Sequence, residues 1–507
     1  MAALLRVVHS GVQDSRLLPE KGQPNPAFFV KAFVRAGRFT TQWVRLDFDT
    51  RPVLGTAATI TLPRKGHLIS KLYLVTTMPD IAAPQLAARR WCAANGKTFA
   101  GPTFGWTNSV GHAVLNSASI EIGGARVEQI DGRLLEILDE FYTPLEKVPV
   151  VDRLLARDST NFVAGRFGRD TVTRAVTPLP FWFSGGDPGT FLPIDAIAAD
   201  QVKVTVQFAA LNTLYVSSDR TDLPAQEVLP PVGGEAYVPL AGSPFYYLEG
   251  ASKAPIPEPA AAMPAAQALS TGLGETYLMA EYIYLDKPEA NRFRLADIQV
   301  PVTQHYAFGP FDSEGAVTTN CYLKIPNPTR NLFFYANRRE ATYYNAPFLA
   351  TRDLSGAEAP LAPWWPNASR IDPRVYTEPV PAYVFRPSEP LAAINLIYEG
   401  KLYRYGTDTP VLFRSLIPSL EHRKSPWVNR YMYALPFGLD PGHYPASLHF
   451  GEANLDKIVN INLQLGFQPR AGYTGAAFTP RYNVYVWAET YNIFRVYGGR
   501  AGMMFSY

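Results

Sequence analysis

The chain has 507 residues, more than one hydrophobic core usually supports, so at least two domains are expected. It carries 47 Lys and Arg against 44 Asp and Glu, a net charge of +3, which argues against sequence-wide nucleic-acid packaging and leaves only a local basic patch open. The two cysteines, Cys92 and Cys321, are too few for a disulfide framework.

The 45 prolines and the 13% aromatic content predict many short strands joined by long loops. Proline breaks helices and central strands, whereas aromatic side chains favour strands and interfaces. The sequence contains no apolar run of about 18 residues that would predict a transmembrane helix. Arg6 and His9 interrupt the start of the chain before a signal-peptide core. We therefore expect a protein that is made and used in the cytosol.

The first half of the chain begins with a polar arm over residues 1–26 and continues as a series of strands. The expected strands cover residues 28–34, 43–48, 68–75, 113–122, 179–183, 191–194, 202–208 and 277–285. The clearest is 202–208, where four apolar residues alternate with three polar ones, as in a half-buried antiparallel strand. Residues 216–275 are rich in Pro, Ala, Gly and Ser and predict a long insertion loop.

One helix is predicted in the first half. Asp131 is a suitable N-cap, and Pro144 ends the helix. Between them, apolar residues recur at helical spacing, namely Leu134, Leu135, Ile137, Leu138 and Phe141.

The second half repeats the strand pattern of the first. Its expected strands cover residues 298–306, 322–325, 332–335, 394–398, 431–435, 447–450, 459–465 and 482–496. Each half thus offers about eight strands, the number in a jelly roll. We predict an all-β fold of two tandem eight-stranded antiparallel jelly rolls with long loop insertions and a few short helices. The expected divisions are an N-terminal arm over 1–26, a first jelly roll over 27–288 and a second over 289–507.

The longest irregular segments predict a tower of loops at one end of the molecule. When the strands of each half are lettered B to I, residues 78–112, 216–275 and 337–390 become the D–E, H–I and D–E loops. Successive antiparallel strands alternate in direction, so these three loops are expected at the same end.

Few residues suggest chemistry. Asn95-Gly96-Lys97-Thr98 fails as a phosphate-binding loop because Trp91 stands where the first glycine is required. Glu136, Asp139 and Glu140 lie close together on the predicted helix; paired carboxylates serve glycosidases, but we interpret these as a solvated helix surface. The histidines are scattered and no G-x-S-x-G occurs, so no catalytic, cofactor or metal site is expected.

Two features lie in the predicted tower. Asn367-Ala368-Ser369 is a candidate N-glycosylation sequon, although chance occurrence in a cytosolic protein is the favoured explanation. Trp364 and Trp365 form an aromatic pair that would serve as an interface or tower anchor, as a stacking platform for a glycan, or as a pin holding the loop to its own domain.

Four segments follow one another along the chain in a recognisable order. They are Gly105–Ala113 with Ile120–Gly124, Pro178–Phe183 with Phe191–Ile194, Glu281–Asp286, and Tyr491–Val496 with Gly499–Gly502. In this order they resemble motifs of the double jelly-roll major capsid proteins of nucleocytoplasmic large DNA viruses. Each motif alone is weak, but four in order over roughly residues 25–507 are specific.

The resemblance implies a structural protein without catalysis or cofactor. It implies a homotrimer that forms pseudo-hexagonal capsomers, contacts neighbouring capsomers and minor capsid and penton proteins, and tiles an icosahedral shell, often over an internal membrane. It implies no direct specific nucleic-acid binding, and a place in the virion after assembly in the host cytoplasm. A jelly-roll glycan-binding or fibre-like surface protein and a β-sandwich glycoside hydrolase remain as alternatives.

Overall fold

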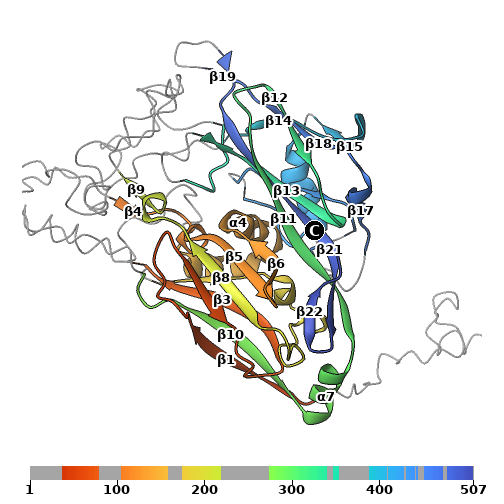
Figure 1. Ribbon diagram of the computed structural model, residues 1–507. Helices are drawn as coiled ribbons and strands as arrows, with labels where there is room; N and C mark the ends of the chain where they lie inside the picture. The colour runs from red at the N-terminus through yellow and green to blue at the C-terminus, as the bar shows by residue number, and fades with distance from the viewer. Residues whose placement is uncertain are drawn as a thin grey trace, which may run out of the picture. The chain divides into compact units, whose positions relative to one another are not determined.

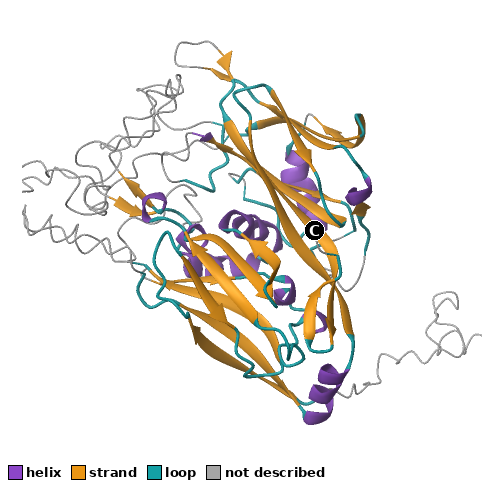
Figure 2. Ribbon diagram, in the orientation of Figure 1, coloured by secondary structure: helices purple, strands orange, loops and turns teal. Residues whose placement is uncertain are grey.

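A computed structural model describes residues 37–78, 104–157, 174–217, 273–339, 346–352, 388–407, 409–427, 430–439, 441–442, 450–471 and 477–505. By its internal contacts the chain divides into two units, Met1–Phe39 and Thr40–Tyr507. The second unit holds nearly all the described residues. Strands dominate it, with a few short helices (Figures 1 and 2).

The first half forms one β-sandwich. One sheet has the order β1 (Phe39–Asp47), β10 (Tyr277–Leu285), β3 (Leu68–Thr77) and β7 (Arg174–Pro178). The other has the order β2 (Ala57–Thr61), β8 (Val202–Phe208), β5 (Leu115–Ile122) and β6 (Ala125–Ile130). When these eight strands are lettered B to I along the chain, the sheets read B-I-D-G and C-H-E-F, which is the jelly-roll topology.

The second half repeats the same order. Its B-I-D-G sheet is β11 (Ile298–Asp312), β21 (Tyr482–Tyr497), β13 (Pro328–Arg338) and β16 (Met432–Pro436). Its C-H-E-F sheet is β12 (Thr318–Leu323), β18 (Ile461–Phe467), β14 (Leu391–Tyr398) and β15 (Lys401–Thr407). The short strands β17 (Ala453–Asn454) and β22 (Arg500–Met503) extend the first of these sheets, and β19 (Arg470–Ala471) pairs with β20 (Ala477–Phe478). The predicted double jelly roll is therefore confirmed.

The helices lie in the connections. The F–G connection of the first roll holds α4 (Gly132–Tyr142), the 3₁₀ turn η2 (Leu145–Lys147) and α5 (Val148–Leu155), and that of the second holds the π-helical turn η9 (Leu412–Leu416) and α8 (Ile417–Glu421). Helix α3 (Val110–Ala113) precedes β5, and α7 (Lys287–Leu295) links the two rolls. Further 3₁₀ turns are η3 (Trp182–Ser184), η4 (Pro188–Thr190), η5 (Leu211–Thr213) and η10 (Leu455–Lys457).

Helix α4 begins and ends where the sequence predicts. The carboxylate of Asp131 accepts a hydrogen bond from the backbone N–H of Leu134 at 2.8 Å, which satisfies one of the free donors of the first turn. The helix ends at Tyr142, two residues before Pro144.

Several predicted strands are confirmed and two are wrong. The alternating segment 202–208 is β8, the predicted strand 277–285 is β10, and 482–496 is β21 with one further residue. The predicted strands 179–183 and 191–194 are instead turns, and the strand of this region is β7. Pro178, Pro180 and Pro193 remove backbone donors there, so the hydrophobic run marks burial of Phe181–Phe183 in the core and not a strand.

Other predictions fall on parts of the chain that the structure does not describe. These are residues 28–34, 447–449, the arm 1–26 and most of the three predicted tower loops. The structure describes the first and last residues of two of these loops, both in the first roll. Strand β4 (Phe104–Trp106) of the D–E connection pairs with β9 (Tyr215–Ser217) of the H–I connection, and the Gly274 N–H donates to the Thr77 carbonyl at 2.8 Å. Both insertions therefore leave the roll side by side.

The core of the first roll predicts the effect of Val204→Asp. Val204 is fully buried in β8 and lies directly opposite Ile60 and Ile120. An uncompensated carboxylate there costs more than the roughly 2–7 kcal/mol of a buried neutral polar group, which approaches the whole stability of a typical domain, about 5–15 kcal/mol. We expect no folded protein, measured as loss of soluble expression and of the thermal transition.

The matched control is Lys203→Asp, one residue earlier on the exposed face of the same strand. It places a carboxylate opposite Glu121, a repulsion of about 1 kcal/mol or less, and should leave the fold intact. A soluble, cooperatively unfolding Val204→Asp chain would contradict the inward orientation of this residue.

Candidate functional site at the interface between the two rolls

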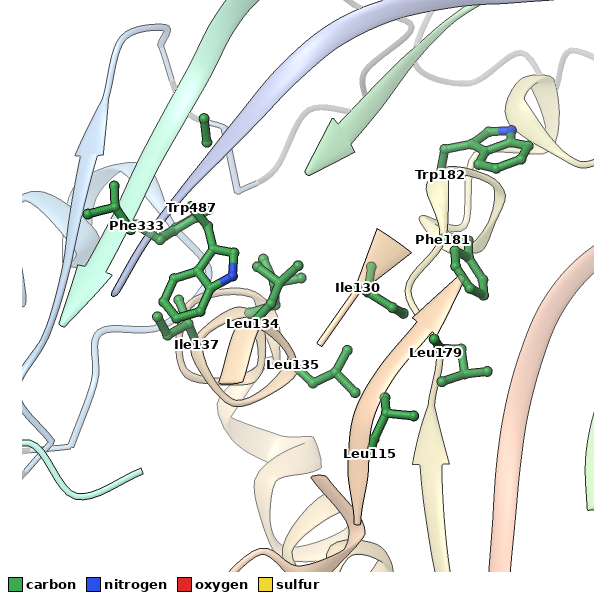
Figure 3. Close-up of a cluster of buried hydrophobic side chains, with 14 of the residues drawn as sticks. Leu115, Ile130, Leu134, Leu135, Ile137, Leu179, Phe181, Trp182, Phe333 and Trp487 are labelled. Atoms are coloured by element: carbon green, nitrogen blue, oxygen red, sulfur yellow. The ribbon is translucent and has the colours of Figure 1, made fainter. Parts of the chain in front are cut away.

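Helix α4 of the first roll packs against the outer face of the second roll's B-I-D-G sheet. Phe333 of β13 lies opposite Trp487 of β21, and Tyr335 lies opposite Tyr485, so the four aromatic side chains share one face of that sheet. The ring of Phe141 in α4 lies 5.3 Å from that of Phe333. Figure 3 shows Phe333 and Trp487 against the helix residues Leu134 and Ile137. This contact joins the cores of the two rolls.

Polar contacts fix both ends of the helix on the sheet. The second carboxylate oxygen of Asp131, the N-cap, accepts a hydrogen bond from the Trp487 indole Nε1–H at 3.0 Å. At the other end, the Tyr142 hydroxyl donates to Glu489 Oε2 at 2.7 Å. The Arg133 guanidinium lies 4.5 Å above the ring centre of Tyr485. The direction and position of α4 on the sheet are therefore both specified.

The carboxylates of α4 lie inside the protein, so the solvated-surface interpretation of Glu136 and Glu140 is wrong. Both residues are fully buried. Glu136 contacts His112 Nδ1 at 2.6 Å, Arg157 at 2.7 Å and Arg430 at 2.9 Å. The sequence gives no signal of this burial, because the apolar residues of α4 form one face at helical spacing and the carboxylates lie on the other, as in an amphipathic surface helix. The partners lie far away in sequence and could not be identified from it.

The remaining charges of this cluster are also paired. Arg157 contacts Asp139 and, at 3.2 Å, Asp152, both in the first roll. Glu140 contacts Lys424 at 3.3 Å and Arg430 at 3.6 Å, and both cations belong to the F–G connection of the second roll. The buried carboxylates of the first roll's F–G connection are therefore neutralised in part by cations of the second roll's F–G connection, and these ion pairs join the two rolls.

The positive charges of the cluster favour the ionised forms of Glu136 and Asp139. Burial alone would raise the pKa of Glu136, but the positive charges of Arg157 and Arg430 outweigh it and hold the pKa well below its usual range. Burial would also raise the pKa of Asp139, but the attraction to Arg157, His112 and Lys424 together with the Thr143 hydrogen bond outweighs it and lowers the pKa. A glycosidase acid needs a raised pKa, so this pair does not have the properties of an acid–base couple.

A second polar group joins β6 of the first roll to β11 of the second. Glu128 is buried and contacts His305 Nδ1 at 3.1 Å, and its other oxygen accepts from the backbone N–H of Trp182 at 3.1 Å. The Gln304 side-chain amide donates to the Val127 carbonyl at 2.7 Å. Burial lowers the pKa of His305, but its hydrogen bond and attraction to Glu128 outweigh this and raise the pKa above its usual value.

The C-terminal hairpin of β21 and β22 adds further contacts between the rolls. The Ala199 N–H donates to the Gly499 carbonyl at 2.9 Å, and the Ala501 N–H donates to the Asp200 carboxylate at 3.2 Å. The Trp182 ring lies 5.2 Å from that of Phe494. Residues that resemble the family's C-terminal motif therefore help hold the rolls together.

The structure does not test the site residues proposed from sequence. Trp364, Trp365 and Asn367 are outside the described residues. Within the described ranges, no group of three or more His, Cys, Asp or Glu is arranged to hold a metal ion, and no helix is long and apolar enough to cross a membrane.

The ion cluster predicts a large effect of Arg157→Met. The substitution keeps much of the side-chain volume but leaves Glu136 and Asp139 without their main partner, and breaking a buried pair in this way costs about 3–5 kcal/mol. We expect this loss in denaturant unfolding. Arg153→Met, at an exposed position of α5, is the control and should change stability by no more than about 0.5 kcal/mol. Equal effects of the two substitutions would contradict a structural role of the cluster.

The Glu128–His305 pair predicts a dependence of stability on pH. The pKa of His305 is raised in the folded protein, so its contribution is fully present below the unfolded pKa of about 6.5 and is lost as the pH rises through the folded pKa. Between pH 6 and 9, Tm should fall more steeply for the unaltered chain than for His305→Gln, which keeps a hydrogen-bonding group without the charge. Parallel Tm profiles for the two chains would show that this pair does not titrate as described.

Comparison with known proteins agrees with the fold. The family model described as "Major capsid protein N-terminus" matches residues 27–286, and that described as "Large eukaryotic DNA virus major capsid protein" matches residues 295–502. The major capsid protein of Pyramimonas orientalis virus is 28% identical over 207 residues, which are 40% of this chain and 46% of that relative. The chain thus spans less than half of that relative's length.

Other similarities extend over the whole chain. The major capsid protein of Invertebrate iridescent virus 6 is 21% identical over 95% of this chain and 93% of its own length. A chain from a quasi-atomic model of the PBCV-1 virus capsid has the same fold, with a TM-score of 0.62 at 17% identity, covering 95% of this chain and all of that one. With both rolls matched by family models and joined by the contacts above, the chain belongs to the major capsid protein family of large eukaryotic DNA viruses.

Proposed function

We propose that three copies of this chain form a pseudo-hexagonal capsomer, and that these capsomers assemble into the icosahedral shell of a large double-stranded DNA virus. The observation that carries the proposal is the buried interface that joins two jelly rolls of the same strand order. Membership of the capsid protein family supports it.

The physical argument is one of symmetry. Two similar sandwiches held side by side supply two similar wedges, so three chains supply six, and a trimer then fits a hexagonal lattice. Heterologous contacts close into a ring only when the rotation between successive units fits. An interface fixed by directional groups, such as the Asp131–Trp487 hydrogen bond and the Glu136–Arg430 ion pair, keeps that rotation constant.

The finer parts of the proposal follow from this role. The chain acts by self-assembly and not by catalysis, and its partners are other copies, minor capsid proteins and penton proteins. An internal membrane is an indirect partner, and direct specific binding of nucleic acid is not part of the function. Assembly takes place in the host cytoplasm, and the finished protein resides in the virion. We place the functional divisions at the arm 1–26, the first roll 27–288 and the second roll 289–507. The glycan-binding alternative rested on Trp364 and Trp365 and gains no support from the described residues.

The proposal predicts the mass of the purified protein in solution. Light scattering should give three times the chain mass of 56.1 kDa, or about 168 kDa, and electron microscopy of concentrated or virion-derived samples should show hexagonal arrays or shells. A chain that stays monomeric at micromolar concentration, alone and with other virion proteins, and forms no array would overturn the proposal.

A further inference from the structure

One contact inside the chain is built from parts that occur twice. The F–G connection of the first roll, through α4, covers the outer face of the second roll's B-I-D-G sheet. The second roll has its own F–G connection, with η9 and α8, and the first roll has its own B-I-D-G sheet, β1-β10-β3-β7. Each roll therefore holds both halves of such a contact.

The F–G connection of the second roll presents apolar side chains to solvent. The exposed fractions are 41% for Val411, 53% for Leu416 and 67% for Leu420. Leu416 is the N-cap of α8 and Leu420 lies four residues later, one helical turn away, so the two side chains share one side of the helix. In α4, by contrast, the large apolar side chains are buried. Exposed neighbouring leucines on a short helix are typical of an interaction surface.

The outer face of the first roll's B-I-D-G sheet is aromatic and accessible. Trp43 of β1 is 46% exposed, and its ring lies 5.6 Å from that of the half-buried Tyr73 in β3. Tyr73 lies opposite Met279 of β10. Two residues along β10, the Tyr277 ring supports the Arg45 guanidinium at 4.2 Å. The second roll likewise receives α4 on aromatic residues of its D and I strands, although there the arginine over Tyr485 is Arg133 of the docked helix and not a residue of the sheet.

We propose that the surface formed by Val411, Leu416 and Leu420 docks on the Trp43–Tyr73–Met279 face of the first roll in a second copy of this chain. The rotation that superimposes the first roll on the second also moves the F–G connection of the first roll onto that of the second. The sheet that receives α4 then becomes the B-I-D-G sheet of a further roll, which is the first roll of the next chain. Among the described residues of one chain, Val411, Leu416, Leu420 and Trp43 are exposed and Tyr73 and Met279 are half-buried, so neither surface is covered by the other. The inference rests on the proposed trimer and names the surfaces that close its ring.

Cross-linking between copies tests the pairing directly. In a Cys92→Ser background, one tagged copy carries Leu420→Cys and a differently tagged copy carries Trp43→Cys. Cys321 does not interfere, because it is fully buried and burial raises the pKa of its thiol to about 12. A short bismaleimide should give a product of twice the chain mass that carries both tags. Leu295→Cys, at an 88% exposed position of α7, replaces Leu420→Cys in the control and should give no such product.

A charge-insertion variant tests the energetics. Leu416→Glu with Leu420→Glu should lower the solution mass from about 168 kDa to the 56.1 kDa of one chain, and the monomer should stay folded with a cooperative thermal transition because both side chains are exposed in the single chain. Leu295→Glu should keep the full mass. If the double variant stays trimeric and the mixed-tag product is absent, the docking inference is overturned while the trimer stands. A monomeric unaltered chain that gives no mixed-tag product overturns both.

Discussion

The burial of helix α4 between the two rolls is the constraint on which the rest of the structure depends. Its apolar residues belong to one core continuous across both rolls, while Glu136 and Glu140 bring negative charge into that core. Taking ions out of water costs as much as or more than their attraction returns, so the cluster is not a source of net stability. The cluster instead specifies the orientation of the two rolls. The buried carboxylates of α4 are all compensated only when Arg430 and Lys424 of the second roll lie against the helix. Apolar contact supplies the attraction, and the ions select one orientation.

The two rolls belong to one compact unit although each has its own two sheets. Three separate parts of the first roll contact the second roll: the F–G helix α4, strand β6 and the turn before β8. Hydrogen bonds that lie far apart on one interface resist rotation about any single contact. In the capsomer that we propose, the chain presents two wedges at a constant angle to a lattice, so resistance to rotation matters more than total affinity between the rolls.

Most of the fold follows from local sequence patterns, whereas most of the interface does not. Alternation specifies β8, and the cap at Asp131 with Pro144 specifies α4, because these signals act within a few residues. The turn at Phe181–Phe183 was mistaken for a strand since hydrophobicity reports burial and not conformation, and the nearby prolines decide the conformation. The partner of Asp131 is Trp487, 356 residues later, and that of Glu136 is Arg430. No local periodicity carries such pairings, so the helix carboxylates looked like surface residues.

The two F–G connections differ in a way that fits their different tasks. The contact made by α4 forms once, during folding of a single chain, so it tolerates buried ions that would be expensive to desolvate in a separate association step. The surface of Val411, Leu416 and Leu420 is exposed in the single chain and offers apolar groups that lose little on association beyond side-chain freedom. The chain thus uses one architecture for two kinds of contact. The contact of α4 within the chain is permanent and specified by charge, and the contact between chains is driven by burial of apolar surface. The same strand order serves both, and the side chains on one short connection determine which contact it makes.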